Sequence, residues 1–288
     1  MCFCKLYADD LKLYTSLYSS DNASVLPSKL DELYCWSITW QLSISFKKCA
    51  IMYVSGTRND DSSSRSGVSR PALCIGSNVI ASVSEMKDMG VVVDNRLDFK
   101  SHVNNIVARA FVRSNLIHKC FISRDVHTLL RAFKTYVRPI LEYASCIWSP
   151  HLLGNIKQIE SVQPQFTKRL LGLANVSYED RLALLHIDSL ETRRLRFDLI
   201  MVYKILSNMV DVPASQRFTR GASSDHYTRE HCHKLVLNYS RVDVRKFFFS
   251  ERITKQWNAL AAQPQDFSSL GSFKDLLGRT NLCELLTL

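Results

Sequence analysis

The sequence lacks the features that would place it outside the cell or in a membrane. No apolar run approaches the roughly 20 residues that a membrane-spanning helix needs. Lys5, Asp9 and Asp10 interrupt any apolar segment that could act as a signal peptide. The nine cysteines include no Cys-x-x-Cys pair, and an odd, scattered set is typical of thiols in a reducing compartment. We therefore expect an intracellular protein, in the nucleus or the cytoplasm, that is not secreted and has no membrane partner.

Acidic residues are too few to balance the basic ones. The 288 residues include 37 Lys and Arg against 27 Asp and Glu, which gives a formal net charge of +10. An excess of this size favours a polyanionic partner, for which nucleic acid and an anionic membrane surface are the usual candidates, although a basic protein without such a partner is the alternative. A hydrophobic fraction of 46% is sufficient for two or three domains with their own cores.

Two adjacent carboxylates, Asp9 and Asp10, lie in the segment Tyr7-Ala8-Asp9-Asp10 near the start of the sequence. Apolar residues before this segment and alternating residues after it predict two β-strands, so we expect the carboxylates at the tip of a hairpin. Clusters of carboxylate oxygens hold Mg²⁺ or Mn²⁺, and polymerases use two such ions roughly 3.5–4 Å apart for nucleotidyl transfer. Considered alone, however, these residues fit a solvated Asp-Asp turn more economically.

Basic residues gather on two predicted helices, 102–116 and 125–137. Each helix has an apolar stripe and a separate basic stripe. Over most of this region the only acidic residue is Asp125, whereas a solvated helix face normally mixes both signs. The imbalance favours contact with phosphates. The cations that we expect to bind nucleic acid are Arg109, Arg113, Arg131, Lys134 and Arg138.

The apolar spacing predicts further elements. A helix that begins near Asp21 or Asn22 should direct five apolar residues into a core: Leu26, Leu30, Leu33, Trp36 and Trp40. Segment 42–54 is predicted as a strand, with Lys48 near its middle, and this lysine also fits the solvent side of an edge strand. Short strands and turns are predicted over 72–94, the last strand beginning at Gly90, after a polar loop over 57–71.

Two prolines and one histidine cluster add specific expectations. Pro139 should break its helix and turn Tyr143 and Trp148 toward the core. Pro164 falls inside a predicted helix, where a proline costs about 3 kcal/mol unless the helix is already bent. A local cluster also invites a zinc hypothesis, but a second pair of ligands is missing nearby, so metal binding there is the lesser alternative. It consists of His226, His231, Cys232 and His233.

The segment Tyr7-Ala8-Asp9-Asp10 resembles the catalytic hairpin of reverse transcriptases. Segments in matching order resemble the enzymes of non-LTR, LINE-like retrotransposons of the jockey and CR1 type. They are Lys87–Asp94, Tyr136–Ala144 with Trp148-Ser149-Pro150, the block 178–211, and the tail with Phe247–Phe249 and Trp257-Asn258. The resemblance covers nearly the whole chain and identifies it as the carboxy-terminal part of such an enzyme. Pro164 departs from the pattern, since the family usually has a basic residue there.

The resemblance implies an α+β fold, in which a truncated polymerase palm of antiparallel strands and a helix precedes a mainly helical thumb. The domains would be a partial palm over 1–100, a thumb or connection region over 101–211 and a helical tail over 212–288. The implied function is RNA-directed DNA polymerisation on an RNA template and a DNA primer with deoxynucleotides, with Mg²⁺ or Mn²⁺ as cofactor. The implied site residues are Asp9 and Asp10 as catalytic metal ligands, Tyr7 beneath the primer end, Lys48 near the departing pyrophosphate, and Gly90 in the primer grip.

Two-metal transfer needs a third carboxylate on a separate strand. In the family this aspartate and the fingers residues lie upstream of the hairpin, and only eight residues precede Asp9. We therefore expect the chain to be inactive alone and active as part of a longer polypeptide. The alternative is a non-catalytic remnant that binds nucleic acid through its basic helices.

Overall fold

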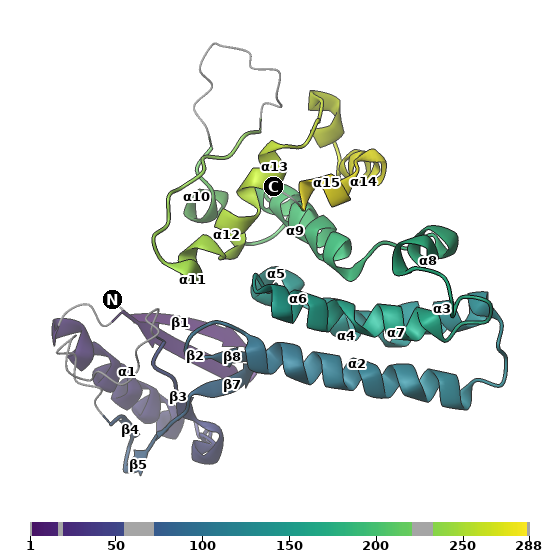
Figure 1. Ribbon diagram of the computed structural model, residues 1–288. Helices are drawn as coiled ribbons and strands as arrows, with labels where there is room; N and C mark the ends of the chain where they lie inside the picture. The colour runs from purple at the N-terminus through teal and green to yellow at the C-terminus, as the bar shows by residue number, and fades with distance from the viewer. Residues whose placement is uncertain (1, 17–19, 55–71, 221–232, 287–288) are drawn as a thin grey trace. The chain divides into compact units, whose positions relative to one another are not determined.

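The computed structural model describes residues 2–16, 20–54, 72–220 and 233–286 (Figure 1). The chain forms two compact units. The first comprises Met1–Asp88 with Val93–Leu97, and the second comprises Met89–Val92 with Asp98–Leu288. The predicted division between 101–211 and 212–288 falls inside the second unit and stays a prediction.

The first unit begins with a β-hairpin. Strands β1 (Cys2–Tyr7) and β2 (Asp10–Thr15) pair antiparallel, and helix α1 (Ser20–Thr39) packs against both. The small core of this unit forms where α1 meets the strands that follow, and its buried residues are Leu30, Leu73 and Ile75. The hairpin that the alternating pattern predicted is therefore confirmed.

Four short strands complete the first unit's sheets. Strand β3 (Ala50–Ile51) runs parallel to β6 (Ala81–Ser82), and β4 (Cys74–Ile75) pairs antiparallel with β5 (Asn78–Val79). Gly76 and Ser77 form the tight turn between β4 and β5, which agrees with the short strands and turns predicted over 72–94. The predicted loop over 57–71 lies almost wholly outside the described residues.

Two predictions for the first unit are wrong. Trp36 and Trp40 are 49% and 66% exposed, because the small core accepts only the neighbouring stripe of α1 that contains Leu30 and Tyr34. The predicted strand over 42–54 is mostly a bend around the short helix η1 (Phe46–Lys48). Within this segment only Ala50 and Ile51 pair with another strand.

A further hairpin contains residues of both units. Strand β7 (Glu85–Asp88) pairs with β8 (Val91–Asp94), and the connecting residues Met89 and Gly90 both have positive φ, at 47° and 86°. A two-residue turn with two positive φ angles matches the right-handed twist of paired strands, and it favours glycine. The strand predicted after Gly90 is confirmed, and the sequence did not indicate its partner.

The described part of the second unit is helical apart from its share of the β7–β8 hairpin and one isolated bridge. Helix α2 (Lys100–Cys120) packs against α3 (Val126–Tyr136), α4 (Arg138–Glu142), α6 (Leu153–Glu160) and α7 (Val162–Lys168). Helix α9 (Leu190–Leu206) contacts α4, α6 and the short α5 (Ser145–Trp148). The short helices therefore lie between α2 and α9, as Figure 1 shows.

Both prolines stand where helices begin. Helix α3 ends at Tyr136, and Pro139 occupies the first turn of α4, so the predicted break is confirmed. Pro164 occupies the first turn of α7, where its missing N–H has no helical partner to lose. The expected cost of a proline inside a helix therefore does not arise there. Beyond the first break Trp148 is fully buried as predicted, whereas Tyr143 is 57% exposed, contrary to prediction.

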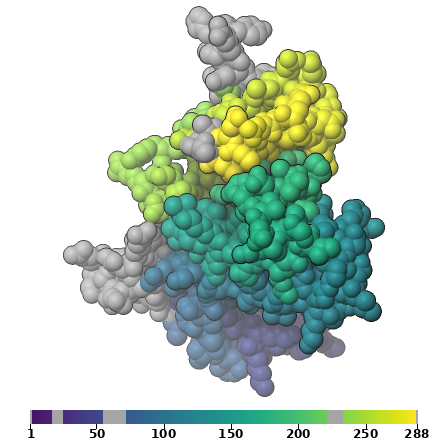
Figure 2. Space-filling view, turned by 45° about the vertical axis from the view of Figure 1, so that its right-hand side comes forward, coloured from purple at the N-terminus to yellow at the C-terminus, as the bar shows by residue number. Residues whose placement is uncertain are grey.

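The carboxy-terminal part packs on α9. After α8 (Tyr178–Leu185) and α9, the chain forms short helices whose bounds are α10 (Ala214–Arg217), α11 (Asp243–Lys246), α12 (Phe249–Arg252), α13 (Thr254–Asn258), η2 (Pro264–Phe267), α14 (Leu270–Arg279) and α15 (Leu282–Leu285). Trp257 and Phe273 are fully buried and share one core with α9 residues such as Tyr203, whose ring stacks on that of Phe273. Figure 2 shows the yellow C-terminal segment lying directly against the green helices.

Among the described helices, none combines the length and the apolar character needed to cross a membrane. The cluster predicted as a lesser zinc candidate is only partly described. His226, His231 and Cys232 lie outside the described residues, and the ring of His233 packs against Phe267.

Candidate functional site

The acidic hairpin places its carboxylates by strand register. Pairing runs from Cys2 opposite Thr15 to Tyr7 opposite Asp10, so Ala8 and Asp9 form the turn. Asp9 is therefore a turn residue, and Asp10 is the first residue of β2. Ala8 has a φ of 52°, which is left-handed and sterically costly for a residue with a Cβ. A non-glycine residue in this region is characteristic of turns that hold a functional group in place.

Alternation along the strands decides what lies beside the carboxylates. Tyr7 and Asp10 are directly opposite each other, so they share one face of the hairpin. The next pair on this face is Lys5 and Lys12, and Lys12 forms an ion pair with Asp88. This ion pair offsets the repulsion between two lysines opposite each other. The face thus presents an aromatic ring and a carboxylate at the tip, with cations behind them.

The tip of the hairpin is exposed to solvent. Tyr7 is 65% exposed, Leu6 is 69% exposed, and both aspartates are exposed. Among the described residues β1 and β2 form a sheet of only two strands, so each strand has one unpaired edge. An isolated two-stranded hairpin is marginally stable in water, and its unpaired edges can accept further strands.

The described residues do not complete a metal site at the hairpin. No group of three or more His, Cys, Asp or Glu side chains in the described part of the chain lies close enough to hold an ion. Two carboxylates supply too few oxygen ligands for a pair of Mg²⁺ ions. Asp9 and Asp10 therefore fit half of such a site.

Lys48 and Gly90 have structural settings that the sequence did not predict. Lys48 is exposed at the end of η1, so it lies on a helical turn, not on an edge strand. Gly90 lies beside Tyr143, whose hydroxyl donates to the Met89 carbonyl at 3.0 Å. A Cβ on Gly90 would lie 3.2 Å from the Tyr143 ring. The turn conformation and this ring both explain the glycine, and neither tests its predicted role in a primer grip.

The five predicted nucleic-acid-binding cations fall into two groups. Arg109 and Arg113 lie on the exposed face of α2. The other three lie on α3 and α4, where Arg131 is exposed while Lys134 and Arg138 are half-buried. The tertiary structure therefore separates the α2 cations, on an exposed helix face, from two α3–α4 cations that are partly covered.

The half-buried cations lie beside residues of α9. Glu142 binds Arg193 through both carboxylate oxygens, one of them at 3.1 Å from Nη2, and lies 3.7 Å from Nε of Arg138. Burial, and then the positive charges of Arg138 and Arg193, lower the pKa of Lys134. Burial and the charge of Arg193 likewise lower the pKa of Arg138. We call the set Lys134, Arg138, Glu142 and Arg193 the α4–α9 seam.

Sequence patterns did not identify the seam, because Arg193 lies 55 residues after Arg138 in the chain. The only available signal was the group of arginines at Arg193, Arg194 and Arg196. Nothing in that group shows that Arg193, and not Arg194, reaches Glu142. Arg194 is 3% exposed, and the negative charges of four carboxylates oppose the lowering of its pKa by burial: Glu160, Glu191, Asp198 and Glu142.

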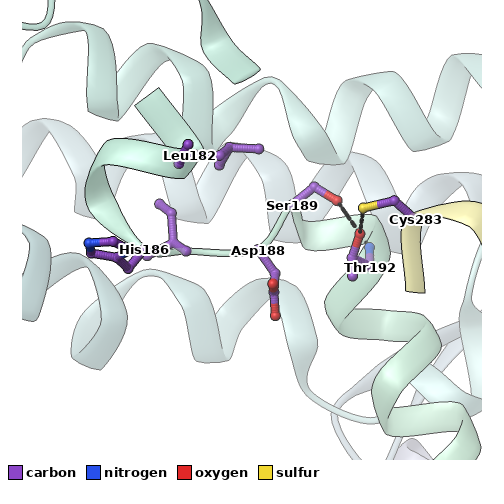
Figure 3. A pocket seen from close by; sticks show the side chains of 8 residues that line it. Leu182, His186, Asp188, Ser189, Thr192 and Cys283 are labelled. Atoms are coloured by element: carbon purple, nitrogen blue, oxygen red, sulfur yellow. Dashed lines mark hydrogen bonds between the residues drawn. The ribbon is translucent and has the colours of Figure 1, made fainter. Parts of the chain in front are cut away.

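A shallow hollow lies where α8 leads into α9 (Figure 3). Its volume is about 330 Å³, and its lining includes Asp188, Ser189, Thr192 and Cys283. These groups are mainly engaged with the protein itself. Ser189 Oγ lies 2.8 Å from Thr192 Oγ1, which lies 3.6 Å from Cys283 Sγ, and Asp188 pairs with Arg196 at 3.0 Å. The hollow therefore gathers helix-capping groups and offers no catalytic constellation.

Comparison with known proteins shows a relationship to mobile-element polymerases. The chain is 23% identical over 170 residues to the RNA-directed DNA polymerase from mobile element jockey of Drosophila funebris, and 25% identical over 172 residues to that of Drosophila melanogaster. Each match covers 58% of this chain and 18% of the relative. An uncharacterized protein of Caenorhabditis elegans is 26% identical over 133 residues, 45% of this chain and 67% of that protein.

Neither a protein-family model nor a solved structure matches the chain. The two polymerase matches nevertheless establish that the chain is related to the reverse transcriptases of non-LTR transposable elements. Because it spans 18% of the length of these relatives, their whole activity does not transfer with the similarity.

Proposed function

We propose that the chain is the carboxy-terminal part of an RNA-directed DNA polymerase of a non-LTR retrotransposon, in which it supplies the end of the palm, the thumb and the tail. The observation that carries the proposal is the hairpin register, which puts Asp9 in the turn and Asp10 opposite Tyr7, in a chain related to jockey polymerases.

In this proposal Asp9 and Asp10 are two of the carboxylates that hold Mg²⁺ or Mn²⁺, and residues outside this sequence supply the third. Bound ions would activate the primer hydroxyl and stabilise the departing pyrophosphate. The chain's own contribution is to hold both carboxylates at an exposed tip, where a template, a primer and a deoxynucleotide can reach them. Tyr7 shares a face with Asp10 and would lie beneath the primer end.

A chimeric enzyme tests the proposal. The part of a jockey polymerase that precedes the matched region is joined to this chain, and extension of a DNA primer on an RNA template is measured in Mg²⁺. We expect extension by the chimera and none by this chain alone. Asp9→Asn and Asp10→Asn should each abolish extension, whereas Asp31→Asn, at an exposed site on α1, should not. Extension that is unchanged by Asp9→Asn would refute the catalytic role of the hairpin.

A non-catalytic remnant that binds nucleic acid is the second candidate. It is favoured by the incomplete set of carboxylates among the described residues and by the excess of basic residues on α2, α3 and α4. A chimera that fails to extend a primer, together with a chain that still binds an RNA–DNA hybrid, would select this alternative.

A further inference from the structure

The α4–α9 seam has more positive charge than its carboxylate can neutralise. Arg193 engages both oxygens of Glu142, and Arg138 reaches the same carboxylate only at 3.7 Å. Among the described residues no acidic side chain lies within ion-pair distance of Lys134. Three cations therefore share one anion.

The surroundings do not supply the missing negative charge. Besides Glu142, the carboxylate that acts on Arg138 is that of Asp188, and it already pairs with Arg196 at 3.0 Å. Counting Arg196 and Asp188 with the seam gives four cations and two carboxylates, an excess of two positive charges. Partly buried charges are normally paired, because taking them out of water costs free energy that only a counter-charge repays.

The geometry of the seam suits an anion with several oxygens. The side chains of Arg138 and Arg193 are 22% and 20% exposed, so they are held by the protein and still reach solvent. Guanidinium groups bind phosphate through a planar fork of N–H donors, and an ammonium group adds a mobile point charge. Arg131 lies one turn before Lys134 on the same face of α3, and it is exposed.

We propose that Lys134, Arg138 and Arg193 bind one backbone phosphate of a nucleic acid, and that Arg131 contacts a neighbouring phosphate of the same strand. This inference rests on the nucleic-acid partner in the proposed function, and it adds Arg193 as a ligand and Glu142 as a competitor. Glu142 holds the two guanidiniums in place while the site is empty, and the arriving phosphate competes with it for their N–H groups.

Binding of a labelled RNA–DNA hybrid across a range of salt concentrations tests the lysine. We expect Lys134→Gln to weaken binding several-fold and to reduce the steepness of the salt dependence by about one unit of exponent, as for the loss of one phosphate contact. Lys274→Gln, at an exposed site on α14, removes the same charge and should have little effect. Equal effects of the two variants would overturn the proposal, since they would reflect net charge alone.

Glu142→Gln tests the competition without removing a cation. It frees Arg138 and Arg193 for the ligand, so we expect the hybrid to bind the Glu142→Gln variant more tightly than it binds the unaltered chain. Asp275→Asn makes the same change in net charge at an exposed site on α14 and serves as the control. If both variants tighten binding equally, the seam is not the site. The melting temperature of each variant shows whether it is folded.

A third arm distinguishes a backbone phosphate from a free one. Inorganic phosphate could raise the melting temperature of the unaltered chain and not that of Lys134→Gln, while the two chains bind the hybrid equally well. In that case the seam binds free phosphate, and the proposal is overturned. If the unaltered chain binds no hybrid at any salt concentration, both the phosphate site at the seam and the nucleic-acid partner of the proposed function are refuted. Binding that depends on Lys134 and Glu142, with a chimera that extends no primer, would leave the seam intact and remove the polymerase function.

Discussion

A buried histidine makes the stability of the helical unit depend on pH. His102 lies in the first turn of α2, is 3% exposed, and packs its ring edge-on against Trp148 at 5.0 Å between ring centroids. Its Nδ1 accepts a hydrogen bond from the Val92 N–H at 3.2 Å, so the neutral ring carries its proton on Nε2. Burial, and then the positive charge of Arg109, lower the pKa of His102 from 6.5 to about 4.

The sign of the pH effect follows from this direction. Between the two pKa values the unfolded chain binds a proton that the folded chain does not, so the free energy of unfolding falls as the pH falls through the window from 6.5 to about 4. The full shift corresponds to about 3 kcal/mol, of which about 2 kcal/mol is already lost near pH 5. Above the ordinary pKa this histidine has no effect on the pH dependence.

The assay compares the unaltered chain with His102→Asn by urea unfolding, followed by the circular dichroism of the helices, near pH 7.5 and near pH 5. Asparagine keeps an acceptor for the Val92 N–H and does not titrate, so its cavity cost is the same at both pH values. We expect the variant to lose about 2 kcal/mol less than the unaltered chain on acidification. His127→Asn, at an exposed site on α3, is the control and should track the unaltered chain.

A difference between the two chains that stays constant with pH would refute the argument, because it would mean that the pKa of His102 is the same in the folded and the unfolded chain. His118, also buried on α2, has a pKa lowered by burial and then by Arg169, and it acts in the same direction. Its contribution is common to both chains, so the comparison removes it. Hydrogen exchange of the Val92 amide gives a local check, since a protonated Nδ1 can no longer accept its hydrogen bond.

Three further changes test the packing around the site. Glu160 accepts hydrogen bonds from two backbone N–H groups at the start of α9, at 3.1 and 3.2 Å. Glu160→Gln should therefore lower the free energy of unfolding by about 1–3 kcal/mol. Glu179→Gln, at an exposed site on α8, is the control and should change it little. Ala8→Gly should stabilise the hairpin by about 0.5 kcal/mol, because the gain from removing a left-handed alanine exceeds the conformational entropy that glycine loses on folding. Faster hydrogen exchange of the hairpin amides in the variant would contradict this prediction. Arg252 pairs with Asp198 at 2.9 Å in the interior, so Arg252→Met alone should cost about 3–5 kcal/mol and Arg252→Met with Asp198→Leu much less. A loss in the double variant equal to the sum of the losses in the two single variants, measured by urea unfolding, would show that the pair is not coupled.

Several elements followed from local sequence because their determinants are neighbours along the chain. Apolar residues before Asp9 and Asp10 and alternating residues after them predicted a hairpin with the carboxylates at its tip, and the register confirms the hairpin. Asp125 caps α3 by accepting a hydrogen bond from the Thr128 N–H at 2.7 Å, so the start of that helix could also be predicted from neighbouring residues. The catalytic use of the carboxylates stays a prediction, since two of them do not complete a metal site.

Other features depended on which surfaces meet. The sequence shows that α1 has apolar residues on adjoining stripes, but Leu73 and Ile75, about forty positions after Leu30, decide which stripe is buried and leave Trp36 and Trp40 exposed. Hydrophobic burial is non-directional, so a helix with a broad apolar face fits its neighbours in more than one rotation. Periodicity alone therefore could not select the stripe that enters the core.

The sequence by itself determined the acidic tip, the excess of basic residues and the order of segments that links the chain to non-LTR polymerases. Only the tertiary structure decided which cations meet. It leaves Arg109 and Arg113 on the exposed face of α2 and brings Lys134 and Arg138 to Arg193 and the shared carboxylate of Glu142. The physical reason is that charge interactions depend on distance and burial, and both are set by how α3, α4 and α9 pack, not by their spacing along the chain.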